Sequence, residues 1–450
     1  MSQFTKWQDF QKPAASGRAN QVDDLKQRVH GRVIEALGPL LEDTNTSDAE
    51  LRRAIADTIH KTIAEDTLVL SGTERAELVR EITDDALGYG PIDRFVKDPT
   101  ISEIMCNGPH DIFVEREGRL VRSDAHFTDE NHLRRVIERI VSEVGRRVDE
   151  STPMVDARLP DGSRVNAVVH PVAVGGPFLT IRKFSKVPLQ ISDLINFGTC
   201  TPAVAHFLDA CVRGRLNCVI SGGTGSGKTT LLNVLSSFVP PSERVVTVED
   251  AKELRLQQEH VVAMETRPPN IEGTGEITIR DLVRNTLRMR PDRIIVGECR
   301  GPEALDMLQA MNTGHDGSLT TIHCNSPRDA LSRIETLVLM AGLDIPARGV
   351  KEQVASALDL IVHVSRLRDG TRRITHVSEV AGMEGETIVL QDLYLFDFGM
   401  GVDADNRFVG RLKSTGIRPR FTDRLSDQGI RLEGELFTLE PFVRRAGGGR

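Results

Sequence analysis

The residues with the most specific chemistry form a glycine-rich stretch that ends in lysine and threonine. The stretch fits G-x-x-x-x-G-K-[ST], the pattern of a loop that binds nucleotide phosphates, and consists of Gly222, Gly223, Thr224, Gly225, Ser226, Gly227, Lys228 and Thr229. Glycine lets the backbone curl so that several N–H groups point at one anion, and a following helix adds the positive end of its dipole. We expect Lys228 to reach the β- and γ-phosphates of ATP and the Thr229 hydroxyl to hold Mg²⁺, with Thr230 as a further nucleotide contact.

The residues on either side of this loop have the patterns of a strand and a helix. Residues 216–220 are mostly apolar and predict a buried strand, whereas residues 229–238 predict a helix. A strand, a loop and a helix in this order are the context that a phosphate-binding loop needs. The alternative is a glycine-rich turn that matches the pattern by chance.

Acidic residues follow two other apolar runs that predict central strands. Glu249 and Asp250 come after residues 245–248, and Glu298 comes shortly after residues 293–296. Ligands of open α/β sheets bind at the carboxyl ends of the strands, so we expect these acids to converge on the nucleotide. Glu298 is the candidate to polarise water or to hold the Mg²⁺ shell, and Glu249 is a second carboxylate. The alternative for Glu249 and Asp250 is a cap on the end of a strand.

Histidines and arginines add candidates for contact with the phosphates. His315 and His323 flank a predicted strand, where they would sense the γ-phosphate; the alternative is a structural histidine. Arg280, Arg284 and Arg288 recur every four residues and are expected to share one helix face. That face is expected to line the phosphate pocket or a subunit junction. The alternative is a basic surface exposed to solvent.

Four of these segments, in order and spacing, resemble the motifs of secretion ATPases. They are the phosphate-binding loop, an "Asp box" at 248–254, a Walker B strand at 294–300 that ends Gly-Glu, and a "His box" at 313–323. Residues 161–166 and 179–184 resemble the N-terminal domain of the same family, and the resemblance runs from about 85 to 382, with a similar tail to 440. The chain most resembles the CpaF/TadA-type ATPases of tight-adherence (Flp/Tad) pilus systems, in the type II/type IV secretion ATPase superfamily. Ala251 stands where many relatives have proline, which changes the stiffness of the turn and leaves the acids in place.

The resemblance implies a fold, a reaction and an assembly. The fold is α/β: a P-loop (RecA-like) ATPase domain with a mostly parallel sheet, preceded by a small α+β (PAS-like) domain and an N-terminal helical bundle. The reaction is hydrolysis of ATP with Mg²⁺, and the family makes Glu249 a possible general base. The assembly is a hexameric ring to which Arg164 and Arg182 contribute as arginine fingers from a neighbouring subunit. The implied partner is an integral platform protein, bound from the cytoplasmic side of the inner membrane.

Changes in the spacing of apolar residues and in the frequency of turn residues along the chain predict its domains. We expect a flexible tail at 1–20, a helical bundle at 21–90, an α+β domain at 91–185, a hinge linker at 186–202 and the ATPase domain at 203–450, whose extension from about 383 is β-rich. The bundle is indicated by apolar residues at helical spacing and by a capping box at 71–74. Paired turns and short alternating runs indicate the α+β domain.

Composition narrows the function further. The 450 residues carry a net charge of −8 and only 4% aromatic residues, so neither nucleic-acid binding nor a base-stacking groove is expected. No apolar run approaches the ~20 residues of a membrane span, so we expect no direct membrane insertion. Six cysteines without C-x-x-C spacing predict buried free thiols. The expected function is a motor ATPase for a pilus or for secretion; a conjugation-type ATPase is the near alternative and a nucleic-acid translocase the remote one.

Overall fold

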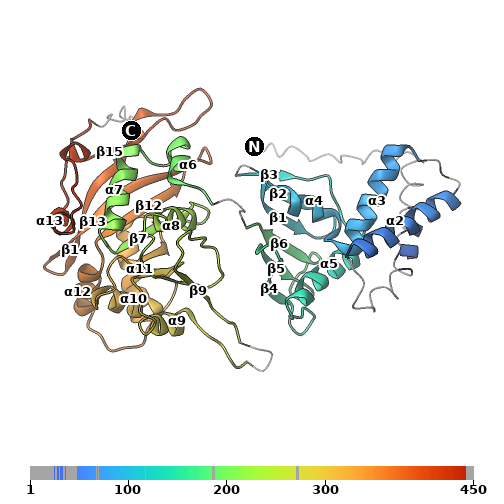
Figure 1. The fold of residues 1–450 in the computed structure, drawn as a ribbon, viewed down its shortest axis with the longest axis horizontal. Coiled ribbons are helices and arrows are strands. Elements are labelled where there is room, and N and C mark those ends of the chain that lie inside the picture. The colour runs from blue at the N-terminus through green and yellow to red at the C-terminus, as the bar shows by residue number, and fades with distance from the viewer. Residues whose placement is uncertain are drawn as a thin grey trace, which may run out of the picture. The chain divides into compact units, whose positions relative to one another are not determined.

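A computed structural model provides the structure of two compact units, formed by residues 1–185 and 186–450. The residues that it describes are 25, 28, 29, 31–33 and 36, and then 48–441 except 67, 69, 117, 185–187 and 270–272. The expected tail at 1–20 lies outside the described residues. Figure 1 shows the two units, which are described one at a time.

The first unit begins with packed helices, as the apolar spacing predicts. The fully described helices here are α2 (Asp48–Glu65) and α3 (Gly72–Leu87). Ser71 Oγ accepts a hydrogen bond from Glu74 N at 3.2 Å, and a carboxylate oxygen of Glu74 accepts one from Ser71 N at 2.7 Å. These bonds form the predicted capping box and fix the start of α3. One hydrophobic cluster joins the predicted helix faces through Leu25, Val29, Val33, Ile55, Ile59, Ile63, Leu78 and Ile82.

The rest of the first unit is an antiparallel sheet with one covering helix. Its described strands are β1 (Ile101–Asn107), β2 (Ile112–Arg116), β3 (Arg119–Arg122), β4 (Met154–Arg158), β5 (Arg164–Val168) and β6 (Phe178–Arg182), in the spatial order β3-β2-β1-β6-β5-β4. Helix α5 (Glu130–Glu143) buries Leu133, Ile137 and Ile140 in the same cluster as the inward residues of the strands. Short helices η1 (Gly90–Ile92) and α4 (Asp93–Lys97) precede β1.

The second unit is built on one sheet, which has nine strands in the described part of the chain. The strands are β7 (Cys218–Gly222), β8 (Val245–Glu249), β9 (Val261–Glu265), β10 (Arg293–Val296), β11 (Leu319–His323), β12 (Leu360–Arg366), β13 (Arg372–Glu384), β14 (Thr387–Phe396) and β15 (Leu412–Ser414). Their spatial order is β15-β14-β13-β12-β7-β11-β10-β8-β9. The six strands from β12 to the β9 edge pair in parallel. The other three strands, β13, β14 and β15, each pair with the preceding strand in antiparallel fashion. The predicted α/β fold with a mostly parallel sheet is confirmed.

Helices cover both faces of this sheet (Figure 1). One face packs against α6 (Ile191–Asn196), α7 (Pro202–Arg213), α8 (Lys228–Ser236), α13 (Thr422–Asp427) and η3 (Gly434–Phe437). The other packs against α9 (Ile279–Thr286), α10 (Glu303–Asn312), α11 (Pro327–Leu339) and α12 (Ala347–Ala357). A short η2 (Phe398–Met400) lies between β14 and β15.

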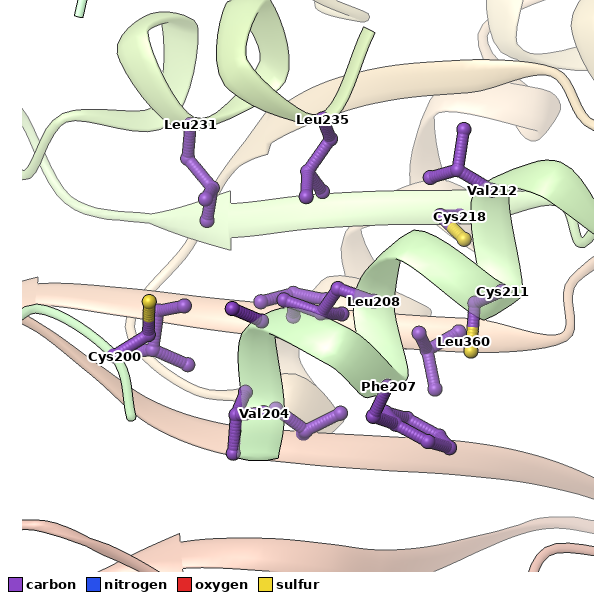
Figure 2. Close-up of a cluster of buried hydrophobic side chains, with 14 of the residues drawn as sticks. Cys200, Val204, Phe207, Leu208, Cys211, Val212, Cys218, Leu231, Leu235 and Leu360 are labelled. Carbon is purple, nitrogen blue, oxygen red and sulfur yellow. The ribbon is translucent and has the colours of Figure 1, made fainter. Parts of the chain in front are cut away.

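Strand β7 shows why the sheet holds its strands firmly. Cys218 and Ile220 lie in the hydrophobic cluster on one face, and Val219 lies in the cluster on the other. Figure 2 shows Phe207 and Leu208 of α7 among the side chains that fill the first cluster. Burial of each large apolar side chain stabilises the fold by about 1.5–3 kcal/mol. A strand anchored on both faces fixes the point at which the glycine-rich loop leaves the sheet.

The predicted linker at 186–202 is more ordered than the sequence suggests. Within it, α6 buries Leu194 in the core of the second unit, and Thr201 caps the start of α7 through a bond from Val204 N. The proline and polar residues of this segment therefore conceal a short helix that belongs to the second unit.

The cysteines and the apolar content of the helices bear on two expectations from composition. All six cysteines are free and buried, which confirms the predicted buried thiols. Burial raises the pKa of the Cys106 thiol to about 12 and that of Cys200 to about 11, so both remain protonated at neutral pH. Among the described residues, no helix combines the length and the apolar character that crossing a bilayer requires.

Candidate active site

The glycine-rich loop connects β7 to α8 and has the backbone of a phosphate cradle. Gly225 and Gly227 have φ values of +66° and +95°, a region in which residues with a side chain are strained. A Cβ at Gly222 would lie 2.3 Å from the carbonyl oxygen of Val364 in the neighbouring strand β12. At Gly223 an added Cβ would meet no atom within 4 Å, so this position faces open space. The backbone thus requires glycine at 222, 225 and 227. The space beside Gly223 is open and can accommodate a ligand.

Lys228 and two threonines stand at the mouth of this cradle. Lys228 is the first residue of α8, and its ammonium donates a hydrogen bond to the Gly223 carbonyl at 2.9 Å, which holds it over the loop. Thr229 and Thr230 occupy the first turn of the same helix. The positive end of the helix dipole and the lysine therefore act on the same space, which is an arrangement that binds phosphate. The residues present fit the phosphates of ATP.

The other predicted residues line the same edge of the sheet. His323 is the last residue of β11 and lies in register with Gly222 of β7. Glu298 follows β10, the next strand along, and Glu249 ends β8, one strand farther. The edge therefore presents the loop, the histidine and the two glutamates in that order. Strands are spaced by about 4.8 Å, so Glu249 starts roughly 14 Å from the P-loop strand, farther than either of the other two.

The sequence of this chain matches two models of protein families. Residues 85–388 match the family described as type II/IV secretion system protein. The chain belongs to this family. Residues 22–87 match the N-terminal domain of type II secretion system protein E. Membership of a family of secretion ATPases confirms the predicted superfamily and the prediction of an ATP-hydrolysing enzyme.

Individual relatives come from conjugation and secretion systems. A putative conjugal transfer protein of Mycobacterium tuberculosis is 37% identical over 342 residues, which cover 75% of this chain and 96% of that protein. Conjugal transfer protein TrbB of Rhizobium radiobacter is 35% identical over 291 residues, or 64% of this chain and 85% of TrbB. The crystal structure of the VirB11 ATPase from the Brucella suis type IV secretion system is 30% identical, covers 64% of this chain and 95% of that one, and has a TM-score of 0.36.

In this secretion ATPase, the two glutamates have different surroundings. Glu249 is 3% exposed, and its Oε1 accepts hydrogen bonds from Glu253 N at 2.8 Å and Leu254 N at 3.0 Å. It thus caps the loop after β8, as the alternative interpretation of this residue expects. Glu298 has a side chain that is 26% exposed and therefore accessible to a ligand. Of the two glutamates, Glu298 is therefore the one that a ligand can reach more readily.

Arg300 is a residue of this edge that the sequence interpretation did not assign. Its Nη2 donates to a carboxylate oxygen of Glu298 at 2.7 Å, and its Nη1 lies 3.8 Å from Oδ2 of Asp250. The hydrogen bond to Glu298 raises the pKa of Arg300, so the guanidinium is charged at any physiological pH. Arg300 therefore ties the acids that follow β8 and β10 together. The sequence signal was available, because this arginine closes the segment 294–300 that resembles Walker B.

His315 lies away from this edge. Strand β11 has 5 residues, begins at Leu319 and runs parallel to β7, and His315 precedes its first residue. Five residues of strand span about 16 Å, so His315 lies at the amino ends of the strands while the glycine-rich loop lies at their carboxyl ends. The prediction that His315 contacts the phosphates bound by the loop of the same chain is wrong. The motif order was correct, but a motif that spans a whole strand has its two ends on opposite edges.

The three helical arginines separate into two groups. Helix α9 ends at Thr286, so the prediction that Arg288 shares its face is wrong. Arg280 and Arg284 do share a face, and each donates through Nε to the carboxylate of Asp306 in α10, at 2.8 and 2.7 Å. These ion pairs hold α9 against α10. Whether the same arginines also serve the phosphate pocket or a subunit junction stays a prediction.

In the first unit, the two predicted arginine fingers stand side by side. Arg164 of β5 lies directly opposite Arg182 of β6, and Arg158 of β4 lies directly opposite Arg164. Glu103 of β1 pairs with Arg182 on its other side, with Nε and Oε1 3.5 Å apart. Like charges at directly opposed positions of a sheet destabilise it. The strand register thus places three arginines in a row, with Glu103 beside the last of them.

Proposed function

We propose that this protein is the hexameric motor ATPase of a tight-adherence (Flp/Tad) type IV pilus of the CpaF/TadA type, or of protein secretion through an inner-membrane platform. The observation that carries the proposal is the shared edge on which the glycine-rich loop, His323 and Glu298 follow one another on adjacent strands. ATP hydrolysis needs neutralised phosphate charge and an oriented water in a closed site. This edge offers a residue for each need.

The loop and its lysine bind and orient the phosphates. The loop amides and Lys228 would neutralise the charge on the β- and γ-phosphates, and the Thr229 hydroxyl would hold Mg²⁺. Within the described residues, no group of three or more His, Cys, Asp or Glu side chains could hold a metal by itself. This fits Mg²⁺, which keeps several waters and in such enzymes binds mainly to substrate phosphates. When bound, the ion would supply neutralisation of the phosphate charge.

Glu298 orients the attacking water or an outer-shell water of the metal, and Arg300 holds the carboxylate in place. A carboxylate fixed by a charged hydrogen bond keeps its direction. His323 stands between the glutamate and the loop in strand order, where its ring can detect the γ-phosphate. Glu249 shapes the loop after β8 and remains the second candidate for general base.

The proposed assembly is based on the arginine fingers that one subunit would contribute to its neighbour. An arginine finger supplies ~10³–10⁵ in rate to enzymes of this kind. The arginine row of the first unit supports a role for Arg164 and Arg182 as fingers contributed by a neighbouring subunit. Head-to-tail contacts of this type close into rings. We propose a six-membered ring, held peripherally at the cytoplasmic side of the inner membrane by an integral platform protein.

A conjugation-type ATPase is the second candidate, because conjugal transfer proteins are among the similar proteins. The two candidates share the chemistry of the site and differ in the machine that the motor drives. Deletion of the gene in the host organism separates them: loss of surface pili supports the pilus motor, and loss of plasmid transfer with normal pili supports conjugation. A nucleic-acid translocase is a third possibility, and ATPase activity that rises severalfold on addition of DNA would favour it over both.

Hydrolysis itself is tested with Lys228→Ala. We expect the purified variant to fold normally and to lose ATP hydrolysis, because the lysine neutralises phosphate charge and is not part of the core. Lys351→Ala is the matched control, since Lys351 lies on α12 and donates to the Glu386 carbonyl. Near-normal turnover by the Lys228 variant would refute the assigned site.

A further inference from the structure

A hairpin that is distant in sequence lies against the glycine-rich loop. Strand β12 runs beside β7 with Val364 opposite Gly222, and it continues two residues farther to Arg366. Arg372, the first residue of β13, lies directly opposite Arg366. The Nη1 atom of Arg366 would lie 3.6 Å from a Cβ on Gly225, and Arg372 Nε donates to the Gly225 carbonyl at 3.0 Å. Two arginines therefore flank the loop on the side away from His323.

The bond from Arg372 controls the direction of one loop amide. A peptide unit is planar and trans, so the carbonyl of Gly225 and the N–H of Ser226 point in opposite directions. By holding the carbonyl toward the hairpin, the Arg372 guanidinium fixes the Ser226 N–H on the opposite side of this peptide, where it donates to the Gly223 carbonyl at 3.4 Å. The same carbonyl accepts the hydrogen bond from Lys228. Phosphate binding by such loops depends on amides aimed inward. A single bond through Nε also leaves a guanidinium with other N–H donors for a phosphate oxygen.

The backbone of Arg372 is itself fixed. Its carbonyl accepts a hydrogen bond from Thr199 Oγ1 at 2.9 Å, and Ile374 N donates to the Thr199 carbonyl at 2.9 Å. Thr199 is 7% exposed, so these bonds lie in a protected environment. The guanidinium is therefore presented to the loop from a rigid support, which is what a positioning residue needs.

Charge supports the same interpretation. Arg366 and Arg372 are like charges in directly opposed positions of an antiparallel pair, an arrangement that destabilises a sheet. The glycine-rich loop beside them is the proposed binding site of an anion, which interacts favourably with both guanidinium groups. The hairpin and the loop therefore both present positive charge to the same bound anion.

We propose that Arg372 is a positioning residue for nucleotide binding, which acts through the 225–226 peptide and is assisted by the charge of Arg366. This inference rests on the proposed nucleotide site. It extends that site to a hairpin about 150 residues beyond the loop in sequence, for which the phosphate-binding pattern gives no signal.

The test uses the full chain with Arg372→Ala, Arg372→Lys and the control Arg368→Ala, an exposed arginine in the turn of the same hairpin. The Kd for a fluorescent ADP analogue and the KM and kcat for Mg-ATP are measured for each. We expect Arg372→Ala to raise Kd and KM about 10-fold or more while kcat changes by less than about threefold, because the lost bond involves a charged donor and acts on binding. Arg372→Lys restores part of the affinity, and Arg368→Ala behaves as wild type.

The outcomes separate this inference from the function on which it rests. Wild-type Kd and KM in Arg372→Ala overturn the positioning role, as does a variant that only melts at a lower temperature with Kd unchanged. A wild-type protein that binds the ADP analogue without hydrolysing ATP refutes the proposed function, while the Kd comparison still decides the role of Arg372. A wild-type protein that binds no ADP analogue refutes both.

Discussion

Glu249 lies against Gly297, its neighbour across two adjacent parallel strands. A Cβ at position 297 would be 2.9 Å from Cγ of Glu249, closer than side-chain carbons normally approach. The strands pair through Val248 and Val296, so the two residues that follow are brought together by register. The Gly-Glu ending of the Walker B segment, in place of Asp-Glu, therefore has a structural reason. The missing side chain makes room for the buried glutamate that ends β8.

Gly297→Ala should displace Glu249 and disturb the acidic edge. We expect a loss of about 1–3 kcal/mol in the free energy of unfolding from the steric conflict. We also expect kcat to fall by about 10²-fold, because Gly297 directly precedes Glu298 and an error of ~1 Å in the position of that carboxylate can cost this much. Gly349→Ala in α12 is the control, because its Cβ would lie 3.5 Å from Ile345, an ordinary contact. Wild-type kcat in Gly297→Ala would show that the position of Glu249 does not matter for catalysis.

Glu298→Gln should bind ATP with near-normal affinity and hydrolyse it slowly. The amide keeps the size of the carboxylate but loses the charge that orients water or metal, which typically costs ~10²–10⁴-fold. Measurement of single-turnover hydrolysis separates the chemical step from product release. Glu249→Gln is the comparison: if it loses more activity than Glu298→Gln while its melting temperature is unchanged, Glu249 carries the step instead.

The sequence predicted which residues lie at the carboxyl ends of the parallel strands, but not the residues that hold them in position. The glycine-rich loop, Glu249, Glu298 and His323 could be placed because each follows a recognisable apolar strand, and parallel strands bring their carboxyl ends together. Arg372 could not be found in this way, since its contact with Gly225 joins residues far apart in the chain. Local patterns predict local elements, whereas tertiary contacts depend on which strands become neighbours.

The errors have equally physical causes. Arg288 was assigned to a helix face by its spacing alone, but the helix ends at Thr286 and the backbone turns before the third arginine. His315 was grouped with His323 because both belong to one motif, although a strand separates them. Arg293 is a separate case, because the predicted strand at 293–296 is present and the structure shows its first residue fully buried with a charged partner.

Removal of one partner from the buried ion pair between Arg293 and Glu243 should destabilise the fold strongly. Arg293 is 0% exposed, and its Nε lies 2.5 Å from a carboxylate oxygen of Glu243. Glu243→Gln leaves the arginine charge buried without its counterion, which typically destabilises by about 3–5 kcal/mol. Urea denaturation measures the change. Glu352→Gln breaks the exposed pair with Arg348 and should leave the midpoint unchanged; an equal effect of the two substitutions would contradict the importance of burial.

Stability should fall as the pH drops from about 6.5 toward 4, in part through His363. Burial, followed by the charge of His376, lowers the pKa of His363 from 6.5 to about 4. Asp329 opposes this shift and Lys228 adds to it, while Ser221 Oγ lies 2.8 Å from its Nδ1. Between the two pKa values, the unfolded chain binds a proton that the folded chain does not, so the loss approaches about 3 kcal/mol at pH 4.

The variant His363→Gln should flatten this pH dependence, because glutamine has no charge to gain. The free energy of unfolding is measured at several pH values between 4 and 7 for the wild type and the variant. His206→Gln, an exposed histidine on α7, is the matched control and should leave the curve unchanged. A wild-type slope in His363→Gln would show that other groups cause the acid sensitivity.

The last prediction concerns the arginine row of the first unit and the proposed ring. If Arg182 acts on the nucleotide of a neighbouring subunit, Arg182→Ala and Lys228→Ala should each be inactive alone and partly active when mixed. In a random equimolar ring, about a quarter of the junctions join an intact loop to an intact finger, so about a quarter of the wild-type activity should return. If the finger acts within its own subunit, every subunit of the mixture carries a defect and activity stays absent.

Two controls make the mixing experiment decisive. A mixture of Lys228→Ala with Glu298→Gln combines two defects assigned to the same subunit's site, so it should remain inactive at every ratio. Activity per subunit of the wild type should also rise with protein concentration as rings form, because the intact site needs a neighbour. If activity per subunit stays constant down to monomeric concentrations and the Arg182 mixture remains inactive, the finger does not act between subunits. Recovery in the Arg182 mixture alone, with the control mixture inactive, would identify the arginine row as the group that one subunit contributes to hydrolysis in the next.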